Sequence, residues 1–240
     1  GEEELQREKS ALWWSGLAAG LSMGFSVVAS ASLMVAFGDQ PWAHPLVAIG
    51  YSTGFIIVIL ARQQLFTENT ITALLPVLAE RSWASGYDML RLGGVVLAAN
   101  LLGAAIFGWL TTLPELFEPQ IRGAIAELGH HLFENTPREM FIKGIAAGWL
   151  IAALVWVLPS LDGGKFWIIM FFTSLIALGE FTHIIAGSIE SFHLLYIGDI
   201  SIAALLLQFM LPTLLGNIVG GSAIFSLASY AQVRREVIEE

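Results

Sequence analysis

The sequence predicts an all-α membrane protein with six transmembrane helices, of which the second and the fifth are interrupted. Hydrophobic residues make up 56% of the 240 residues and charged residues 13%, whereas about 25% of the residues of soluble proteins are charged. The uncharged stretches are long enough for spanning helices, which need about 20 apolar residues. Short signatures also recur in two halves of the chain, as in membrane proteins built from internal repeats.

The distribution of charge defines the six spans. The stretches without Asp, Glu, Lys or Arg cover residues 10–38, 40–61, 92–114, 144–161 and 200–233. The stretch 166–189 is broken only by Glu180. The piece 69–79 is too short to cross a bilayer alone, so we assign it to the second half of an interrupted span that starts near residue 45.

The chain is expected to form one membrane domain over residues 1–240, with related halves at about 10–114 and 138–235. The long connection 115–137 carries apolar residues at helical spacing, namely Ile121, Ile125, Leu128, Leu132 and Phe133. This pattern predicts an amphipathic helix on the outer surface. A structural cover or subunit contact is its favoured role, and a gating lid is the alternative.

Basic residues predict the orientation of the chain. Six spans place both termini on one side of the membrane. If that side is cytoplasmic, its loops and tails hold Arg7, Lys9, Arg81, Arg91, Lys165, Arg234 and Arg235. The opposite side then holds Arg122, Arg138 and Lys143. This bias agrees with the positive-inside rule, so both termini are expected to be cytoplasmic.

Three short signatures occur once in each half of the chain. Residues 65–68 read Leu-Phe-Thr-Glu and residues 180–183 read Glu-Phe-Thr-His, with the Phe-Thr pairs 115 positions apart. Asn100 and Asn217, each before a run of small residues, lie 117 positions apart. Each half also has a glycine pair, Gly16 with Gly20 and Gly144 with Gly148. Because paired broken helices mark substrate paths in membrane proteins, we expect a path at the two interruptions.

The polar residues nearest that path are Thr67 and His183. His183 is the only histidine inside an expected span, whereas His44, His130, His131 and His193 lie in or beside loops and are expected at the surface. An imidazole, with an ordinary pKa of about 6.5, suits proton exchange with a weak acid. The alternative is that His183 only satisfies a neighbouring hydroxyl. In the Phe-Thr alignment, Glu68 takes the position of His183.

Other polar residues of the interruptions are expected to have structural tasks. A charge in the middle of a membrane costs about 3 kcal/mol on insertion scales. Arg62 and Glu68 are therefore expected to pair with each other or to lie near the inner interface. The amides of Asn100 and Asn217 are expected to hold the broken backbone of a neighbouring helix rather than to contact substrate.

The combination of these residues resembles the formate/nitrite transporter family. The matching pieces are Gly54-Phe55, Leu65-Phe66-Thr67 with Asn69, Asn100 with Gly103, His183 with Ala186, and LPTLLGNIVGG over residues 211–221. Each piece alone is weak, but together they cover all six expected spans. The sequence of residues 61–70 and 182–184 is similar to that of a branch of the family found in the bacterial inner membrane.

The resemblance implies an aquaporin-like fold with inverted three-helix repeats, in a homopentamer with one pore per protomer. It implies that Thr67 and His183 form a polar pair at mid-pore, supported by Asn217. Thr182 and Glu68 would lie along the same pathway. The constrictions implied are an inner one formed by Leu65, Phe66 and Phe55, and an outer one formed by Tyr51 with Leu175 or Ile176.

The chain also departs from the family's pattern. Gln64 and Thr182 stand where the family has acidic residues, and Gly148 replaces an asparagine. A vestibule lysine that attracts anions has no clear counterpart, and Lys143 is the nearest substitute. Glu68 adds a negative charge in the first interruption. These changes alter the field that an anion would feel, so formate and nitrite are not assumed to be the substrates.

Three functions are compatible with the sequence. The favoured one is passage of a small monovalent weak-acid anion across a lipid bilayer, passive or proton-coupled through His183. A channel for neutral small solutes is the first alternative, and a membrane scaffold or sensor without transport is the second. No metal, cofactor or enzymatic activity is expected, because no metal-ligand cluster or nucleophile–base pair stands out. The net charge of −9 argues against nucleic acid as a partner.

Overall fold

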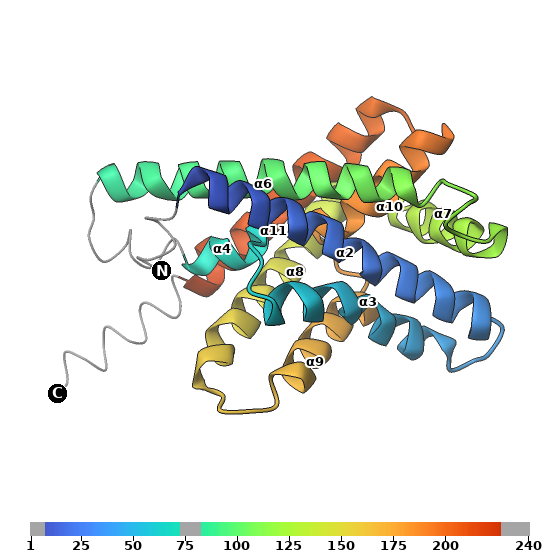
Figure 1. Ribbon diagram of the computed structural model, residues 1–240, viewed down its shortest axis with the longest axis horizontal. Helices are drawn as coiled ribbons and strands as arrows, with labels where there is room; N and C mark the ends of the chain where they lie inside the picture. Colours follow the sequence, from blue (N-terminus) through green and yellow to red (C-terminus); the bar gives the residue numbers. More distant parts are fainter. Residues whose placement is uncertain (1–7, 73–82, 227–240) are drawn as a thin grey trace.

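A computed structural model of the chain describes residues 8–72 and 83–226, and every regular element in these ranges is a helix (Figure 1). The elements are α2 (Lys9–Phe37), α3 (Ala43–Leu60), α4 (Phe66–Thr72), α6 (Trp83–Leu110), α7 (Pro119–Phe133), α8 (Pro137–Val157), the 3₁₀ helix η1 (Leu158–Ser160), α9 (Lys165–Leu178), α10 (Ile184–Ile197), the π-helix η2 (Ala204–Met210), α11 (Leu211–Ile218) and the π-helix η3 (Val219–Ser226). Parts of two expected spans, 73–79 and 227–233, lie outside the described residues, as do Arg7, Arg81, Arg234 and Arg235.

Five helical stretches in the described part of the chain are long and apolar enough to cross a membrane: Lys9–Phe37, Ala43–Leu60, Gly86–Leu110, Pro137–Ser160 and Ala204–Ser222. The apolar helices α9 and α10 are shorter, with 14 residues each. The chain leaves the helical conformation between α3 and α4, and again between α9 and α10. Both departures fall where polar residues interrupt the apolar sequence.

Helices α6 and α8 begin earlier in the chain than the uncharged stretches 92–114 and 144–161 from which they were predicted. Helix α6 includes Asp88 and Arg91, which form an ion pair of 3.4 Å one turn apart. Helix α8 starts at Pro137 because Thr136 and Glu139 form a capping box that satisfies the free N–H groups of its first turn. Charged residues thus mark the ends of the apolar stretches, but not the ends of these helices.

Small residues allow the helices to pack closely. Helix α2 packs against both α3 and α6, and α8 packs against α11 and η3 (Figure 1). A Cβ atom on Gly20 of α2 would lie 2.2 Å from the carbonyl oxygen of Asn100. A Cβ atom on Gly148 of α8 would lie 2.3 Å from the carbonyl oxygen of Asn217. Only glycine permits these two approaches, and they recur at matched positions in the two halves of the chain.

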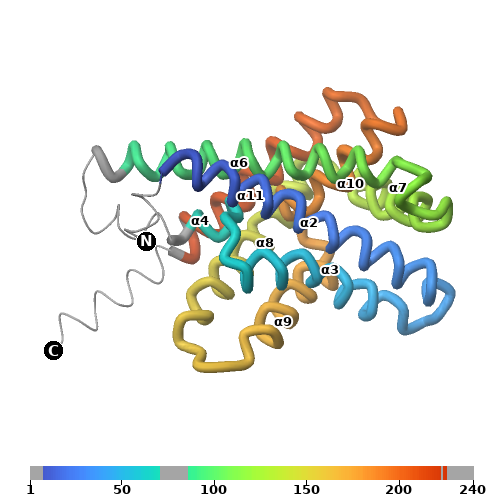
Figure 2. Tube along the Cα trace, viewed as in Figure 1, coloured from blue at the N-terminus to red at the C-terminus, as the bar shows by residue number. Residues whose placement is uncertain are grey.

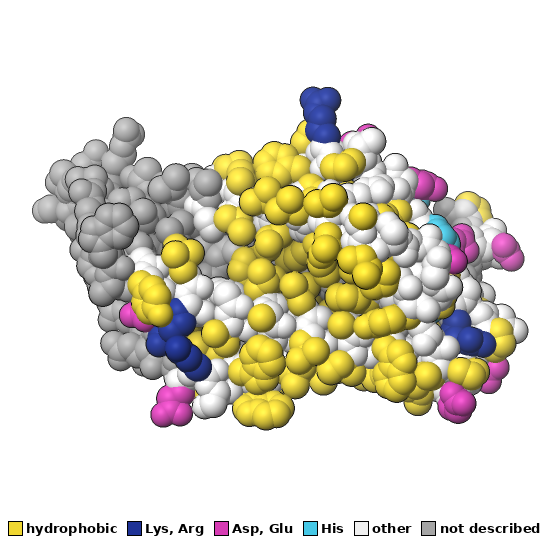
Figure 3. Space-filling view, turned by 90° about the horizontal axis from the view of Figure 1, so that it is seen from above, with side chains coloured by type: hydrophobic (Ala, Val, Ile, Leu, Met, Phe, Trp, Pro, Cys, Tyr) yellow, Lys and Arg dark blue, Asp and Glu magenta, His cyan; other side chains and the backbone are white. Residues whose placement is uncertain are grey.

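The surface of the molecule suits a lipid bilayer. Figure 3 shows a broad belt of hydrophobic side chains across the middle of one face, with most charged side chains toward its two ends. Six tryptophans are among the exposed hydrophobic residues: Trp14, Trp42, Trp109, Trp149, Trp156 and Trp167. Figure 2 shows α4, η3 and the first turns of α2 and α6 at one end of the molecule, and α7 at the other.

Helix α7 lies within the connection 115–137 and packs against α2 and α10. Its apolar residues Ile121, Ile125, Leu128, Leu132 and Phe133 pack on the hydrophobic core. The side chain of Gln208 donates hydrogen bonds to the carbonyl oxygens of Phe133 and Asn135, at 2.9 and 3.0 Å. His130 lies 2.9 Å from Asp199, beyond the end of α10. These contacts fix α7 beside α10.

Candidate functional site

The break between α3 and α4 is held by the buried side chain of Asn100 from α6. Its Oδ1 atom accepts a hydrogen bond of 2.9 Å from the backbone N–H of Phe66. Its Nδ2 atom donates to the carbonyl oxygens of Gln64, at 2.9 Å, and Gly16, at 2.7 Å. One amide therefore satisfies backbone groups on both sides of the break, as non-helical backbone at membrane depth requires.

The break between α9 and α10 is held in the same way by Asn217 of α11. Its Oδ1 atom accepts from the N–H of Ile184, and its Nδ2 atom donates to the carbonyl oxygens of Thr182 and Gly144, all at 2.9 Å. Both asparagines have the structural task that the sequence predicted. Asn217 thus supports the backbone on either side of His183.

These bonds show which residues of the two breaks correspond. Asn100 binds the groups of Gln64 and Phe66, whereas Asn217 binds those of Thr182 and Ile184. The residue between each pair is Leu65 in the first break and His183 in the second. The counterpart of His183 is therefore Leu65, and the expected match with Glu68 is wrong by three positions.

Arg62 and Glu180 occupy equivalent turns in this register. They are the non-glycine residues with positive φ in the described chain, at 54° and 50°. The following residues form matching hydrogen bonds of 2.9 Å, from Gln63 N to Val58 O and from Phe181 N to Ile176 O. The side chain of Arg62 is exposed.

The two breaks meet at a hydrogen bond of 2.8 Å between Thr67 Oγ1 and His183 Nε2. Both side chains are buried. His183 also caps α10, because its Nδ1 atom accepts a hydrogen bond of 3.3 Å from the backbone N–H of Ala186. A backbone N–H can only donate, so we assign the neutral imidazole its proton on Nε2, from which it donates to Thr67. The hydroxyl proton of Thr67 is then available for another acceptor.

Aromatic and aliphatic side chains surround this pair. The ring of Phe55 packs edge-on against the His183 ring, with centroids 5.0 Å apart, and Tyr51 packs against Phe55 at 5.4 Å. Leu65 and Phe66 are buried beside the first break. Of the two candidates for the outer constriction, Ile176 is buried and Leu175 is half-buried.

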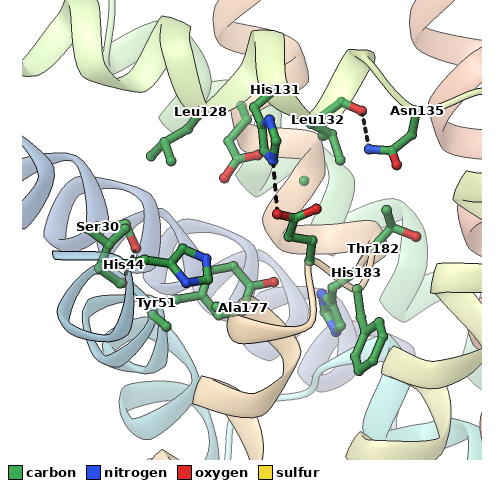
Figure 4. A pocket seen from close by; sticks show the side chains of 16 residues that line it. Ser30, His44, Tyr51, Leu128, His131, Leu132, Asn135, Ala177, Thr182 and His183 are labelled. Atoms are coloured by element: carbon green, nitrogen blue, oxygen red, sulfur yellow. Dashed lines mark hydrogen bonds and ion pairs between the residues drawn. The ribbon is translucent and has the colours of Figure 1, made fainter. Parts of the chain in front are cut away.

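A pocket of about 190 Å³ leads to His183 (Figure 4). Tyr51, Thr182 and His183 line it. His44 and His131 are exposed, as expected, and they line the pocket as well. A separate pocket of about 300 Å³ is lined by Phe66 and by residues of α6 and α11. Phe66 thus lines the second pocket, whereas His183 lines only the first.

The structure does not bring every predicted site residue to the Thr67–His183 pair. Thr182 lines the pocket, but its hydroxyl donates to the carbonyl oxygen of Met140 at 2.7 Å. Glu68 follows Thr67 in the first turn of α4 and is absent from the residues that line the pocket of His183. Lys143 lies 3.3 Å from Glu180.

One histidine that was expected at the surface is buried. His193 was expected at the surface, but it is buried in α10, which continues to Ile197. Its Nδ1 atom lies 2.8 Å from Thr111 Oγ1, and that hydroxyl donates to the carbonyl oxygen of Gly108. Nδ1 of His193 must therefore carry the proton. Its role is to join α10 to the end of α6.

The pocket of His183 is bordered by a partial positive charge and by two carboxylates. The N-terminus of α10, which carries about half a positive charge, lies at His183. Glu180 and Glu190 line the same pocket. Among residues 8–72 and 83–226, no group of three or more histidine, aspartate or glutamate side chains is placed to hold a metal ion.

Comparison with known proteins gives consistent matches. The model of the formate/nitrite transporter family matches residues 1–231. The chain is 45% identical over 237 residues to the inner membrane protein YfdC of Escherichia coli strain K12, covering 99% of this chain and 76% of that protein. It is 27% identical over 220 residues to the uncharacterized transporter YwcJ of Bacillus subtilis strain 168, covering 88% and 85%. A solved pentameric formate channel with formate bound shares the fold, with a TM-score of 0.81, 20% identity, and coverage of 95% and 99%.

Proposed function

The chain belongs to the formate/nitrite transporter family of membrane channels and transporters, and from this premise we propose that it carries small monovalent weak acids through the site of Thr67 and His183. The observation that carries the proposal is the 2.8 Å hydrogen bond joining these residues at the junction of two broken helices. We place the protein in the bacterial inner membrane, because its relative YfdC is an inner membrane protein.

The proposed architecture has six spans in one domain, with inverted halves at about 10–114 and 138–235. Helices α3 and α4 form the second span, and α9 and α10 the fifth. The matching hydrogen bonds of Asn100 and Asn217 support the repeat. We propose a homopentamer with cytoplasmic termini, since the solved formate channel is pentameric and the basic residues favour that orientation.

The proposed path is narrowed by apolar side chains on either side of the polar pair. Leu65, Phe66 and Phe55 form the inner constriction, and Tyr51 with Leu175 or Ile176 the outer one. An ion pays a large desolvation penalty in such a region. The positive N-terminus of α10 and the Thr67 hydroxyl offset part of that penalty. A proton added to the anion removes it, because the neutral acid is far more soluble in apolar surroundings.

The hydrogen bonds of His183 determine how such a proton would move. Nε2 donates to Thr67, and Nδ1 accepts from the N–H of Ala186. The Nε2 proton can pass to Thr67 Oγ1 as the hydroxyl proton passes to the substrate. The imidazole must take up a proton at Nδ1 from water in the pocket as it loses the Nε2 proton, which requires the contact with Ala186 to open. The relay thus leaves His183 neutral, in its other tautomer.

Transport in proteoliposomes tests this proposal. The change is His183→Phe, which keeps a planar ring but removes both nitrogen atoms. The control is Trp167→Phe, an exposed ring on α9 that lines neither pocket. We expect uptake of formate or nitrite driven by an inward proton gradient to fall at least tenfold in the first variant and to persist in the second. Equal proton-driven uptake by the parent and His183→Phe would refute the relay.

One observation favours a neutral-solute channel as the second candidate. The residues lining the pocket of His183 include two glutamates and, within the described chain, no lysine or arginine. Such a lining does not attract anions. Swelling of vesicles in neutral solutes without any flux of weak acids would make this the preferred function.

A further inference from the structure

Glu180 lies at the rim of the pocket that leads to His183. It lines that pocket and also a wider neighbouring hollow of about 830 Å³ between α2, α3 and α7. Its Oε2 atom is 3.3 Å from Lys143 Nζ. Its Oε1 atom is 3.4 Å from Nε2 of His131, a residue labelled in Figure 4. Any solute that enters His183's pocket from the wider hollow passes this carboxylate.

Lys143 is a cation close to this entrance, and Glu180 stands between it and the path. Lys143 lines neither hollow, whereas Glu180 lines both. A carboxylate about 3 Å from an ammonium group cancels most of its field at longer range. The wider hollow also carries Asp39, Glu127 and Glu134, which leaves no positive excess near the entrance.

Glu180 adopts a backbone conformation that is unfavourable for a residue with a side chain. Its φ of 50° is in the left-handed region, which costs a non-glycine residue about 1 kcal/mol. A glycine would remove this strain, and Gly179 directly precedes it. Its counterpart in the first break, Arg62, has the same strained conformation and the opposite charge.

We propose that Glu180 is a specificity-determining residue that cancels the positive charge of Lys143 at the pocket entrance. The entrance then discriminates against the ionised form of a weak acid in favour of its neutral form. This inference rests on the proposed function and adds the chemical form in which the solute enters from this side.

A double-mutant cycle with Glu180→Gln and Lys143→Met tests the proposal. At neutral pH formate is ionised, and formamide is a neutral solute of similar size. Glu180→Gln frees the charge of Lys143, so the KM for formate should fall about three- to tenfold, while formamide permeation is unchanged. Lys143→Met should raise the KM, and the double variant should return it toward the parent value. Glu115→Gln removes an exposed charge from the same end of the molecule and should have no effect.

Two transport results would overturn the inference. The first is an unchanged KM for formate in Glu180→Gln. The second is an equal fall in KM with and without Lys143, since the carboxylate would then act alone.

A second measurement does not depend on transport. An anionic amine reagent, trinitrobenzenesulfonate, should label Lys143 several times faster in Glu180→Gln than in the parent, as followed by peptide mass spectrometry. Equal labelling would overturn the shielding of Lys143. Absence of any weak-acid flux in the parent would instead count against the proposed function, and the labelling result would still decide whether Glu180 shields Lys143.

Discussion

Replacement of Asn217 by aspartate isolates the role of the amide that supports His183. Aspartate has nearly the same shape and keeps the oxygen that accepts from the N–H of Ile184. It replaces the nitrogen that donates to Thr182 and Gly144 by a second oxygen. The ionised carboxylate therefore removes two hydrogen bonds without creating a cavity, and it places an oxygen atom against two carbonyl oxygens; a protonated carboxyl group would restore only one of the two bonds.

The size of the effect follows from these two bonds. A buried acceptor left without its donor costs about 1–3 kcal/mol, and side-chain hydrogen bonds within membranes average about 0.6 kcal/mol. Two lost bonds therefore destabilise the folded protein by roughly 1–6 kcal/mol, and repulsion between the oxygen atoms favours the upper half of that range. We expect about 3 kcal/mol, which should lower the Tm by several degrees.

The assay is thermal unfolding of the purified protein in detergent, followed by tryptophan fluorescence. Asn100→Asp removes the matching bonds in the first break and should produce a similar shift. Gln120→Glu makes the same chemical change on the exposed surface of α7 and should leave the Tm within about one degree. A Tm of Asn217→Asp indistinguishable from that of Gln120→Glu would refute the reasoning.

Three further substitutions test the packing, capping and chemistry of the fold. Gly148→Ala would place a Cβ atom 2.3 Å from the carbonyl oxygen of Asn217, so the two helices must separate; we expect a loss of about 2 kcal/mol and a lower yield of folded protein in size-exclusion chromatography. Thr136→Ala removes the capping box of α8 and should lower stability by about 1 kcal/mol, measured as Tm. Thr67→Val removes the hydrogen bond to His183 and should reduce weak-acid uptake at least tenfold, whereas Thr67→Ser should retain most of it.

The two breaks were predictable because their chemistry is visible in the sequence. Polar residues within apolar stretches cannot continue as ordinary lipid-exposed helix, and the helices do end at Leu60 and Leu178. The asparagines were also predictable, since backbone groups freed inside a membrane need partners. The Thr67–His183 contact itself depends on side chains 116 positions apart, and it was expected only through the family resemblance.

The register of the repeat was not predictable in the same way. The two Phe-Thr pairs are alike in letters, but Phe66 begins α4 whereas Phe181 lies two residues before the cap of α10. Hydrogen bonding by Asn100 and Asn217 depends on backbone position and not on side-chain identity. The Phe-Thr pairs can therefore be shifted by three residues relative to the equivalent backbone positions without changing the fold. An alignment based on these pairs matches the wrong residues.

His193 shows a second limit of the sequence. Glu190 marked the end of the expected fifth span, because a charge inside a membrane is costly. Helix α10 nevertheless continues to Ile197, and Glu190 lines the pocket of His183. A carboxylate facing a pocket keeps access to a polar environment, so charge alone does not locate the end of the helix. His193, one turn further along the same helix, is instead buried against Thr111 at the end of α6.

The two breaks have the same backbone hydrogen bonds but carry different side chains at equivalent positions. Equivalent positions carry Leu65 and His183 before the half-helices, and Arg62 and Glu180 at the preceding turns. At the first pair of positions only His183 has an ionisable side chain, and the two turns carry opposite charge. Glu180 lines the pocket of His183, whereas Arg62 is exposed and is not among the residues lining that pocket or the pocket beside Phe66. On the proposed path a weak acid would therefore meet the carboxylate of Glu180 first and the imidazole of His183 beyond it, so the second break carries the groups that would distinguish the ionised from the neutral solute.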